Sequence, residues 1–176
     1  YSKGDYDRDI ADFTQALKLK PNDASAYGVR GAAYDSKGDY DRAVADYTQA
    51  IKLDPNAASA YKWRGDAYRS KEDYDRAIAD YTQAIKLDPN NALAYGIRGV
   101  AYGEKGDYDR AIADYTQAVK LDPNDTSAYR SRGFAYYSKN DYDRAMVDYT
   151  QALKLDPNDA FAYRFRGFAY YSKNDY

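Results

Sequence analysis

Residues 58–91 read ASAYKWRGDAYRSKEDYDRAIADYTQAIKLDPNN, and close copies of this segment fill the rest of the chain. The copies stay in register, because a proline returns every 34 residues, at Pro21, Pro55, Pro89, Pro123 and Pro157. A chain that repeats at a fixed period of about 20 to 50 residues is an array of one small structural unit. The whole units are residues 24–57, 58–91, 92–125 and 126–159, and partial units occupy residues 1–23 and 160–176.

Each unit is predicted to form two helices. In the first whole unit, residues 24–37 have the apolar spacing of a helix. Gly38 ends this helix, because glycine adopts the left-handed conformation at a helix C-terminus without steric cost. Asp39 then caps a second helix, which ends at about Leu53 before the proline. Asn56 is expected to cap the next first helix, so each unit is a helical hairpin.

One unit departs from this turn. Glu72 stands where the other whole units have glycine or asparagine, at the end of the first helix. A left-handed backbone is uncommon for a residue with a long side chain. We therefore expect Glu72 to be strained and the substitution Glu72→Gly to stabilise the fold.

The repeated positions resemble those of the tetratricopeptide repeat family. In the second whole unit they are Tyr61, Gly65, Tyr68, Ala77, Tyr81, Ala84 and Pro89. All four whole units match, so the resemblance covers essentially the whole chain, residues 1–176, as a single array. It implies an all-α fold, a right-handed superhelical solenoid of antiparallel helix pairs. It also implies that the first helices line a concave groove in which most members bind peptides or partner proteins.

An arginine replaces the leucine that the family commonly has before the glycine. These residues are Arg30, Arg64, Arg98, Arg132 and Arg166. A buried arginine must be paired, and equally regular aspartates are available on the second helices. The aspartates are Asp12, Asp46, Asp80, Asp114 and Asp148. We favour structural ion pairs over the alternative, a basic ladder that binds anionic ligands.

The composition argues against most enzyme chemistry. Cysteine and histidine are absent, which removes thiolate nucleophiles, the usual zinc ligands and the commonest general base. The remaining polar residues recur with the repeat instead of forming one singular cluster, so we expect no enzyme, no cofactor and no metal. Lysine and arginine number 26 against 28 acids, a balance that disfavours nucleic acid as a partner, including an RNA-reading repeat. No apolar run suits a membrane, and a cytoplasmic location is expected.

The first helices vary at only some positions. The second, fifth, sixth, ninth and twelfth positions, and once the thirteenth, change from unit to unit and fall within about 120° of helix surface, opposite the constant positions. We expect this variable face to bind a ligand, and packing against another copy or helix is the alternative. The candidate groove residues are Lys62, Trp63, Asp66, Arg69, Val100, Arg130, Phe134, Tyr137, Phe161, Arg164, Phe165, Phe168 and Tyr171.

The groove becomes aromatic and basic toward the C-terminal half, a composition typical of binding hot spots. A peptide with acidic and apolar side chains would suit it. One family subgroup grips a C-terminal carboxylate with lysine, asparagine and arginine on three successive first helices. Here Lys62 is followed by Asp66 where asparagine belongs, and Ile97 stands at the next such position, so this mode is not expected.

The two partial units suggest self-association. Residues 1–23 hold only a second helix, and residues 160–176 hold only a first helix. The first residue is Tyr1, so trimmed ends are expected. The last helix would leave an apolar face uncovered, formed by Ala162, Tyr163, Gly167, Ala169 and Tyr170. Copies could join head to tail through it, which makes a self-assembling repeat array, natural or engineered, the alternative to a peptide-binding scaffold.

Overall fold

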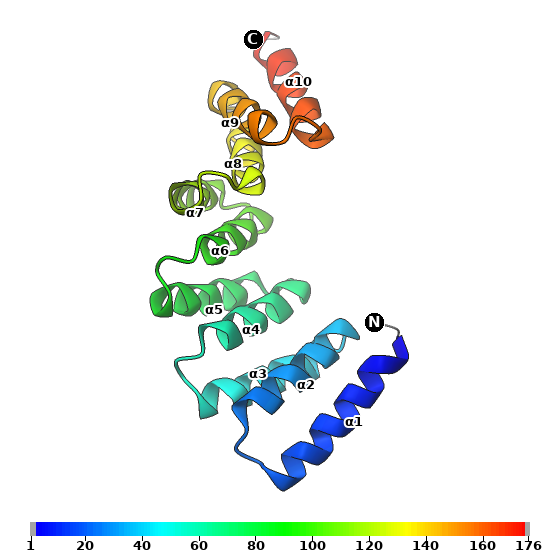
Figure 1. Ribbon diagram of the computed structural model, residues 1–176. Helices are drawn as coiled ribbons and strands as arrows, with labels where there is room; N and C mark the ends of the chain where they lie inside the picture. Colours follow the sequence, from blue (N-terminus) through cyan, green and yellow to red (C-terminus); the bar gives the residue numbers. More distant parts are fainter. Residues whose placement is uncertain (1–2, 175–176) are drawn as a thin grey trace. The chain divides into compact units, whose positions relative to one another are not determined.

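The structure, a computed structural model, describes residues 3–174, and every regular element in that range is an α-helix (Figure 1). The helices are α1 (Lys3–Leu19), α2 (Ala24–Ser36), α3 (Tyr40–Leu53), α4 (Ala58–Ser70), α5 (Tyr74–Leu87), α6 (Ala92–Glu104), α7 (Tyr108–Leu121), α8 (Thr126–Ser138), α9 (Tyr142–Leu155) and α10 (Ala160–Asn174).

The chain divides into two compact units, each held together by contacts among its own residues. The N-terminal unit is residues 1–89 and contains α1–α5, and the C-terminal unit is residues 90–176 and contains α6–α10. Within each unit the helices pack in chain order, so that α3 packs against α2 and α4, and α7 packs against α6 and α8. Figure 1 shows the two helices of a hairpin running antiparallel. The predicted all-α fold of paired helices is thus confirmed.

The turn inside each hairpin needs one left-handed residue. Gly38 and Gly106 have φ of 75° and 84°, and Asn140 has φ of 61°. Glu72 has φ of 59°, so the expected left-handed backbone at this glutamate is confirmed. Asp39 then accepts a hydrogen bond from the Arg42 amide at 3.2 Å, and the same cap recurs on every later second helix.

The prediction that Asn56 caps the next first helix is wrong. The N-cap position of α4 is Ala57, which has no side chain that can accept a hydrogen bond. Asn56 lies in the preceding turn, where its backbone N–H donates to Asp54 Oδ1 at 3.1 Å. The other first helices carry Asp or Asn at the position of Ala57, and these side chains do cap.

A tyrosine and a glycine lock the two helices of each hairpin together. The ring of Tyr47 on α3 packs so closely against Gly31 on α2 that a Cβ on this glycine would lie 2.8 Å from the ring. The same fit recurs where Tyr81 meets Gly65, at 2.7 Å, and where Tyr115 meets Gly99. The tyrosines are buried, so the constant positions of the repeat form its core.

The arginine ladder is a set of buried ion pairs. Both ends of the Arg64 guanidinium reach Asp80, with Nε and Nη2 2.8 and 2.7 Å from its two carboxylate oxygens. Hydrogen bonding to Asp80 raises the pKa of Arg64. The same two-point contact joins Arg30 to Asp46, Arg98 to Asp114, and Arg132 to Asp148. The structural interpretation is therefore confirmed for these four arginines, whereas the fifth, Arg166, donates to Thr150 and has no carboxylate partner among the described residues.

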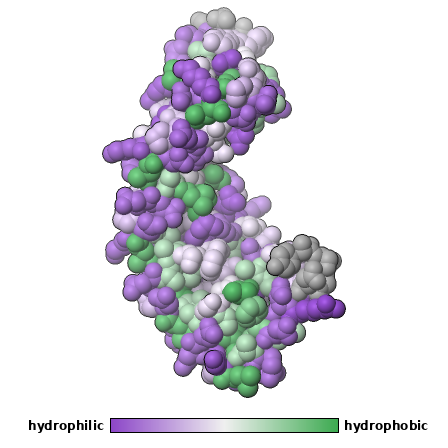
Figure 2. Space-filling model, in the orientation of Figure 1, coloured by the Kyte–Doolittle hydropathy of each residue, from purple (hydrophilic) through white to green (hydrophobic). Residues whose placement is uncertain are grey.

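No helix among residues 3–174 is long and apolar enough to cross a membrane. The surface of both units mixes hydrophilic residues with hydrophobic ones (Figure 2).

Candidate functional site

Apart from Gly28, which is buried, the variable positions of the first helices are half-buried or exposed, as the helical spacing predicts. In α8 the constant residues Ala128, Gly133 and Ala135 are buried. Phe134, at a variable position of the same helix, is 39% exposed. The first helices thus carry a constant face that packs and a variable face that is free to differ.

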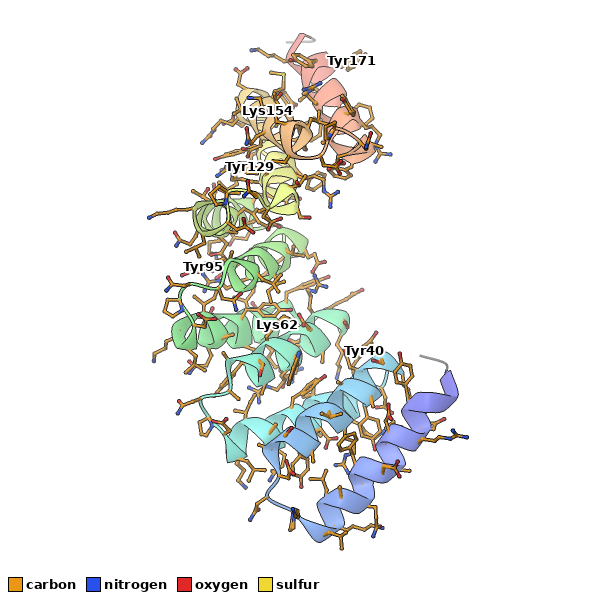
Figure 3. The ribbon with its side chains drawn as sticks, in the orientation of Figure 1. Tyr40, Lys62, Tyr95, Tyr129, Lys154 and Tyr171 are labelled. Atoms are coloured by element: carbon orange, nitrogen blue, oxygen red, sulfur yellow. The ribbon has the colours of Figure 1, made fainter. Side chains whose placement is uncertain are left out.

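On the N-terminal unit, the variable face makes contacts within the unit. Lys62 projects from α4 (Figure 3) and donates to Asp66 at 2.8 Å, and the Tyr81 hydroxyl donates to the other oxygen of this carboxylate. The Trp63 ring lies over Tyr47, with their centroids 6.0 Å apart. The expected candidates Lys62, Trp63 and Asp66 are therefore engaged inside the unit, and Arg69 lies half-buried one turn further along α4.

Asp35, on the neighbouring first helix α2, is an unusual carboxylate. Its Oδ1 atom is buried and has no hydrogen-bond partner among the described residues. Burial raises the pKa of Asp35, and the nearby charge of Asp66 raises it further, while Lys62 opposes both effects. This group weakens the N-terminal unit at neutral pH and supplies no built ligand site.

On the C-terminal unit, aromatic rings gather between α8 and α10. Phe161 stacks on Phe165 with centroids 4.2 Å apart, and Phe134 meets Phe165 edge to face at 5.4 Å. Tyr137 and Phe168 also pack edge to face against Phe165, at 5.9 and 5.7 Å. Phe165 is thus the centre of the cluster, so it and Tyr137 serve packing more than contact with a ligand.

The outer members of this cluster remain accessible. Phe168 is 46% exposed. Tyr171, further along α10 (Figure 3), is 70% exposed. Arg164, also exposed, holds its guanidinium 5.2 Å from the centre of the Phe165 ring. Aromatic and arginine side chains together on an open helix face are the usual composition of a binding hot spot.

A cavity of about 480 Å³ opens beside this cluster, entirely within the C-terminal unit. Its lining includes four of the expected groove residues, Val100, Arg130, Phe134 and Phe161. The Arg130 guanidinium stands 5.3 Å from the centre of the Phe161 ring and 3.5 Å from an Asp159 oxygen. The volume falls within the range typical of ligand pockets, about 300–1,000 Å³.

Six other lining residues were not among the expected groove residues: Gly103, Ser131, Tyr115, Glu104, Tyr108 and Ala135. The first two are small where other units carry large side chains, and Tyr115 belongs to the constant core. The sequence held one signal for this cavity: Gly103 and Ser131 are both small and lie on neighbouring first helices. That signal becomes visible only when these helices are placed on either side of the tyrosine.

The expected self-association face of α10 is only partly open. Tyr163 and Tyr170 are 51% and 54% exposed, and a Cβ on Gly167 would have no neighbour within 4 Å. Ala162 is fully buried, because it packs into the core formed with Tyr149 on α9. Ala169 is buried as well, so the prediction that these two alanines are uncovered is wrong.

No group of histidine, cysteine, aspartate or glutamate in the described part of the chain could hold a metal ion.

The chain resembles known helical repeat proteins throughout. Models of the tetratricopeptide repeat match residues 1–47, 29–92 and 64–126, and a TPR repeat model matches residues 133–174. The solved structure of MamA is 30% identical, with a TM-score of 0.84 over 90% of this chain and 92% of that one. A search of curated proteins found no match.

Two further structures are described with a peptide or its site. YrrB, described as a TPR protein with an unusual peptide-binding site, is 28% identical, with a TM-score of 0.78 over 93% of this chain and 84% of that one. The first TPR of Spaghetti (RPAP3), solved with the HSP90 peptide SRMEEVD, is 30% identical, with a TM-score of 0.65 over 66% and 93% of the two chains.

Hairpins of one repeated sequence, packed in chain order, define a helical repeat protein. The matches along the sequence specify which kind, because the chain belongs to the tetratricopeptide repeat family. Members of this family are generally non-enzymatic scaffolds for protein interaction.

Proposed function

We propose that this chain is a non-enzymatic scaffold that binds a peptide or a partner protein on the variable face of its C-terminal unit. The observation that carries the proposal is an open cavity beside exposed aromatic side chains, with Arg130 at the cavity and Arg164 on α10. Within the N-terminal unit, by contrast, Lys62 and Asp66 on the corresponding face bond to each other.

The chemistry of this surface favours a ligand with apolar and acidic side chains. An aromatic side chain buries about 150–250 Å² in an interface, and each Å² of apolar surface is worth about 25 cal/mol. Covering Phe168 and Tyr171 would therefore supply several kcal/mol before the costs of association. Arg164 would add a charge-assisted hydrogen bond to a carboxylate of the ligand.

The test is a selection from a displayed peptide library against the full chain, followed by titration of the selected peptides. We expect the double variant Phe168→Ala with Arg164→Glu to bind them at least tenfold more weakly. Val29→Ala, at a variable position of α2 that is 44% exposed, is the matched control and should bind normally. A library that yields no binder, or binders that ignore the double variant, would refute the proposal.

Head-to-tail association of copies of the 176-residue chain is a second candidate. Tyr149 fills the space beside Gly133, where an added Cβ would lie 3.0 Å from its ring. An added Cβ on Gly167, the corresponding residue of α10, would meet no such ring within 4 Å. Arg166 donates to Thr150 and has no carboxylate partner among the described residues. The helix α1 of another copy carries Asp12 and Phe13 at the positions of Asp46 and Tyr47.

One residue of α1 opposes this docking. Asp9 stands where the other second helices have an alanine that is fully buried, as Ala43 is, so docking would bury a carboxylate in an apolar core. Sedimentation over a wide concentration range tests the idea. We expect Asp9→Ala to promote association and Gly167→Leu to abolish it. A monomer at all concentrations with Asp9→Ala would exclude it.

A further inference from the structure

We infer that the cavity of the C-terminal unit is a receptor for an aromatic side chain of the bound peptide, which would lie over Tyr115 as the chain's own rings lie over Tyr47 and Tyr149. The inference rests on the proposed function and names the chemistry of the ligand at that site. Its basis is a comparison among repeats that share one framework and differ in the residues around this tyrosine.

Two of the buried tyrosines are covered by an aromatic ring from the next first helix. Trp63 lies over Tyr47 with the ring centroids 6.0 Å apart, and Phe165 lies over Tyr149 at 6.2 Å. Both rings come from the sixth position of a first helix. This position is therefore the one from which the repeat covers its core tyrosine.

Over Tyr115 the sixth position supplies only Ser131. The twelfth position of the preceding first helix is also empty, because Gly103 stands where Asp35 and Tyr137 stand beside the other two tyrosines. A Cβ on Gly103 would lie 4.0 Å from the Tyr115 hydroxyl oxygen. The two positions that carry larger side chains beside Tyr47 and Tyr149 thus both carry small residues beside Tyr115.

The glycine that borders the Trp63 ring has a counterpart in the C-terminal unit. A Cβ on Gly28 would lie 3.4 Å from the Trp63 ring, so this glycine forms one side of the space that the indole fills. Gly96 is the corresponding residue of the C-terminal unit, and a Cβ there would have no neighbour within 4 Å. The C-terminal unit therefore has the same small residue at this position of the repeat, without the ring that packs against it in the N-terminal unit.

The lining favours an aromatic ring over an aliphatic side chain. Tyr115, at the floor, is 5% exposed, whereas Tyr47 is 1% exposed. Phe134 and Phe161 form a wall, and aromatic rings interact with one another in edge-to-face or offset geometry beyond their buried area. The Arg130 guanidinium beside the Phe161 ring can also approach the face of a bound ring.

The occupant we assign is a peptide side chain and not a free aromatic molecule. The reason is continuity with the exposed surface of α10, because Phe161 lines the cavity and also stacks on Phe165, which Phe168 and Arg164 contact. A chain anchored in the cavity by one ring can therefore continue across α10.

The test uses the full chain and three blocked peptides, Ac-DGWGD-NH2 and the same peptide with leucine or alanine at the centre. We expect the tryptophan peptide to bind at least tenfold more tightly than the alanine peptide and severalfold more tightly than the leucine peptide. Chemical shifts measured by NMR should change most at Val100, Gly103 and Ser131.

The decisive variant is Ser131→Trp, which gives this repeat the residue that Trp63 provides in the N-terminal unit. The indole should fill the cavity, reduce binding of the tryptophan peptide at least tenfold, and leave the melting temperature unchanged or higher. Ser127→Trp, at an exposed variable position of the same helix, is the matched control and should bind normally. Gly103→Tyr copies Tyr137 and provides a second way to fill the cavity.

The outcomes separate the two proposals. If library peptides bind and are lost with Phe168→Ala and Arg164→Glu but tolerate both cavity-filling variants, the aromatic receptor is refuted and the scaffold function stands. Equal affinity for the tryptophan and alanine peptides refutes the receptor as well. If N-acetyl-tryptophanamide binds as tightly as the tryptophan peptide, the site takes a free aromatic molecule and the peptide assignment is wrong.

Discussion

At the scale of single residues, the hairpin turns show how one backbone requirement is met by different side chains. Gly38 and Gly106 adopt a left-handed conformation without steric cost, and Asn140 is one of the few other residues that tolerate it. Glu72 adopts the same conformation with a Cβ and no such tolerance. This turn is therefore the most strained of the four, although its hydrogen bonds match the others.

Glu72→Gly is expected to raise the free energy of unfolding by about 1 kcal/mol, because it removes the contact between the Cβ and the carbonyl oxygen that disfavours left-handed residues. Urea denaturation measures the change. The reciprocal control, Gly106→Glu, should lower the stability by a similar amount. A destabilised Glu72→Gly variant would contradict this account of the turn.

Asp35 provides a prediction that depends on pH. Burial raises the pKa of Asp35 in the folded state, so its deprotonation favours the unfolded chain. The penalty is absent below the unfolded pKa, about 3.9, and grows as the pH rises toward the raised folded pKa. Asp35→Asn should therefore stabilise the protein at pH 7, because the amide carries no charge that burial penalises.

The gain from Asp35→Asn should shrink as the pH falls toward 3.9 and below, where both states of the parent chain are protonated. Urea denaturation of the parent and the variant across this range measures the difference in their free energies of unfolding. The contributions of the other carboxylates are the same in both proteins and cancel. Asp41→Asn, which removes an exposed carboxylate at the start of α3, controls for the change in net charge. A gain that does not vary with pH would show that charge at Asp35 is not the cause.

At the scale of the helix pair, the fit of a tyrosine against a glycine determines how closely two helices approach. Gly99→Ala would place a Cβ 2.8 Å from the buried Tyr115 ring, which cannot move without disturbing the core. We expect a loss of about 1–3 kcal/mol, as for other overpacked cores. Gly167→Ala is the control, since its Cβ meets nothing and alanine favours a helix by about 0.5–1 kcal/mol. Thermal unfolding of the two variants should thus shift in opposite directions.

Much of this element-level structure can be predicted from the sequence, because the repeat averages out local ambiguity. The turn residues, the caps at Asp39 and its equivalents, and the pairing of Arg64 with Asp80 all follow from residue type and helical spacing. The prediction for Asn56 was wrong because α4 begins one residue later than expected, so Ala57 occupies the N-cap position. The prediction that Ala162 is uncovered was wrong because this residue packs against α9.

The candidate site was harder to predict for a different physical reason. Exposed aromatics such as Phe168 are visible in the sequence as large residues at variable positions. A cavity is a volume that no side chain fills, and it depends on Gly103, Ser131 and Tyr115 from three separate helices. Knowing that the two small residues meet over the same tyrosine requires the three-dimensional packing.

At the scale of the whole molecule, both units are built from the same repeat, so the residues that differ between them can be tested for their effect on binding. The N-terminal unit fills the space over Tyr47 with its own Trp63, whereas in the C-terminal unit a cavity lies beside Tyr115. If small residues alone create the aromatic receptor, the same small residues should create a second receptor in the N-terminal unit. Such a transfer of the site needs only the removal of Trp63 and Asp35.

We expect Trp63→Ser with Asp35→Gly to create a second aromatic site over Tyr47. The exchange should cost about 3 kcal/mol for the lost indole and about 1 kcal/mol for glycine in a helix, so Glu72→Gly is included to offset part of the loss. Titration with Ac-DGWGD-NH2 should then show two sites, the new one weaker because Asp66 stands where Phe134 lines the original. Trp63→Phe keeps a ring in place and should show one site. A folded transfer variant that binds a single peptide would mean that empty volume over the tyrosine is not enough, and that the Phe134 and Phe161 wall is what selects an aromatic ligand.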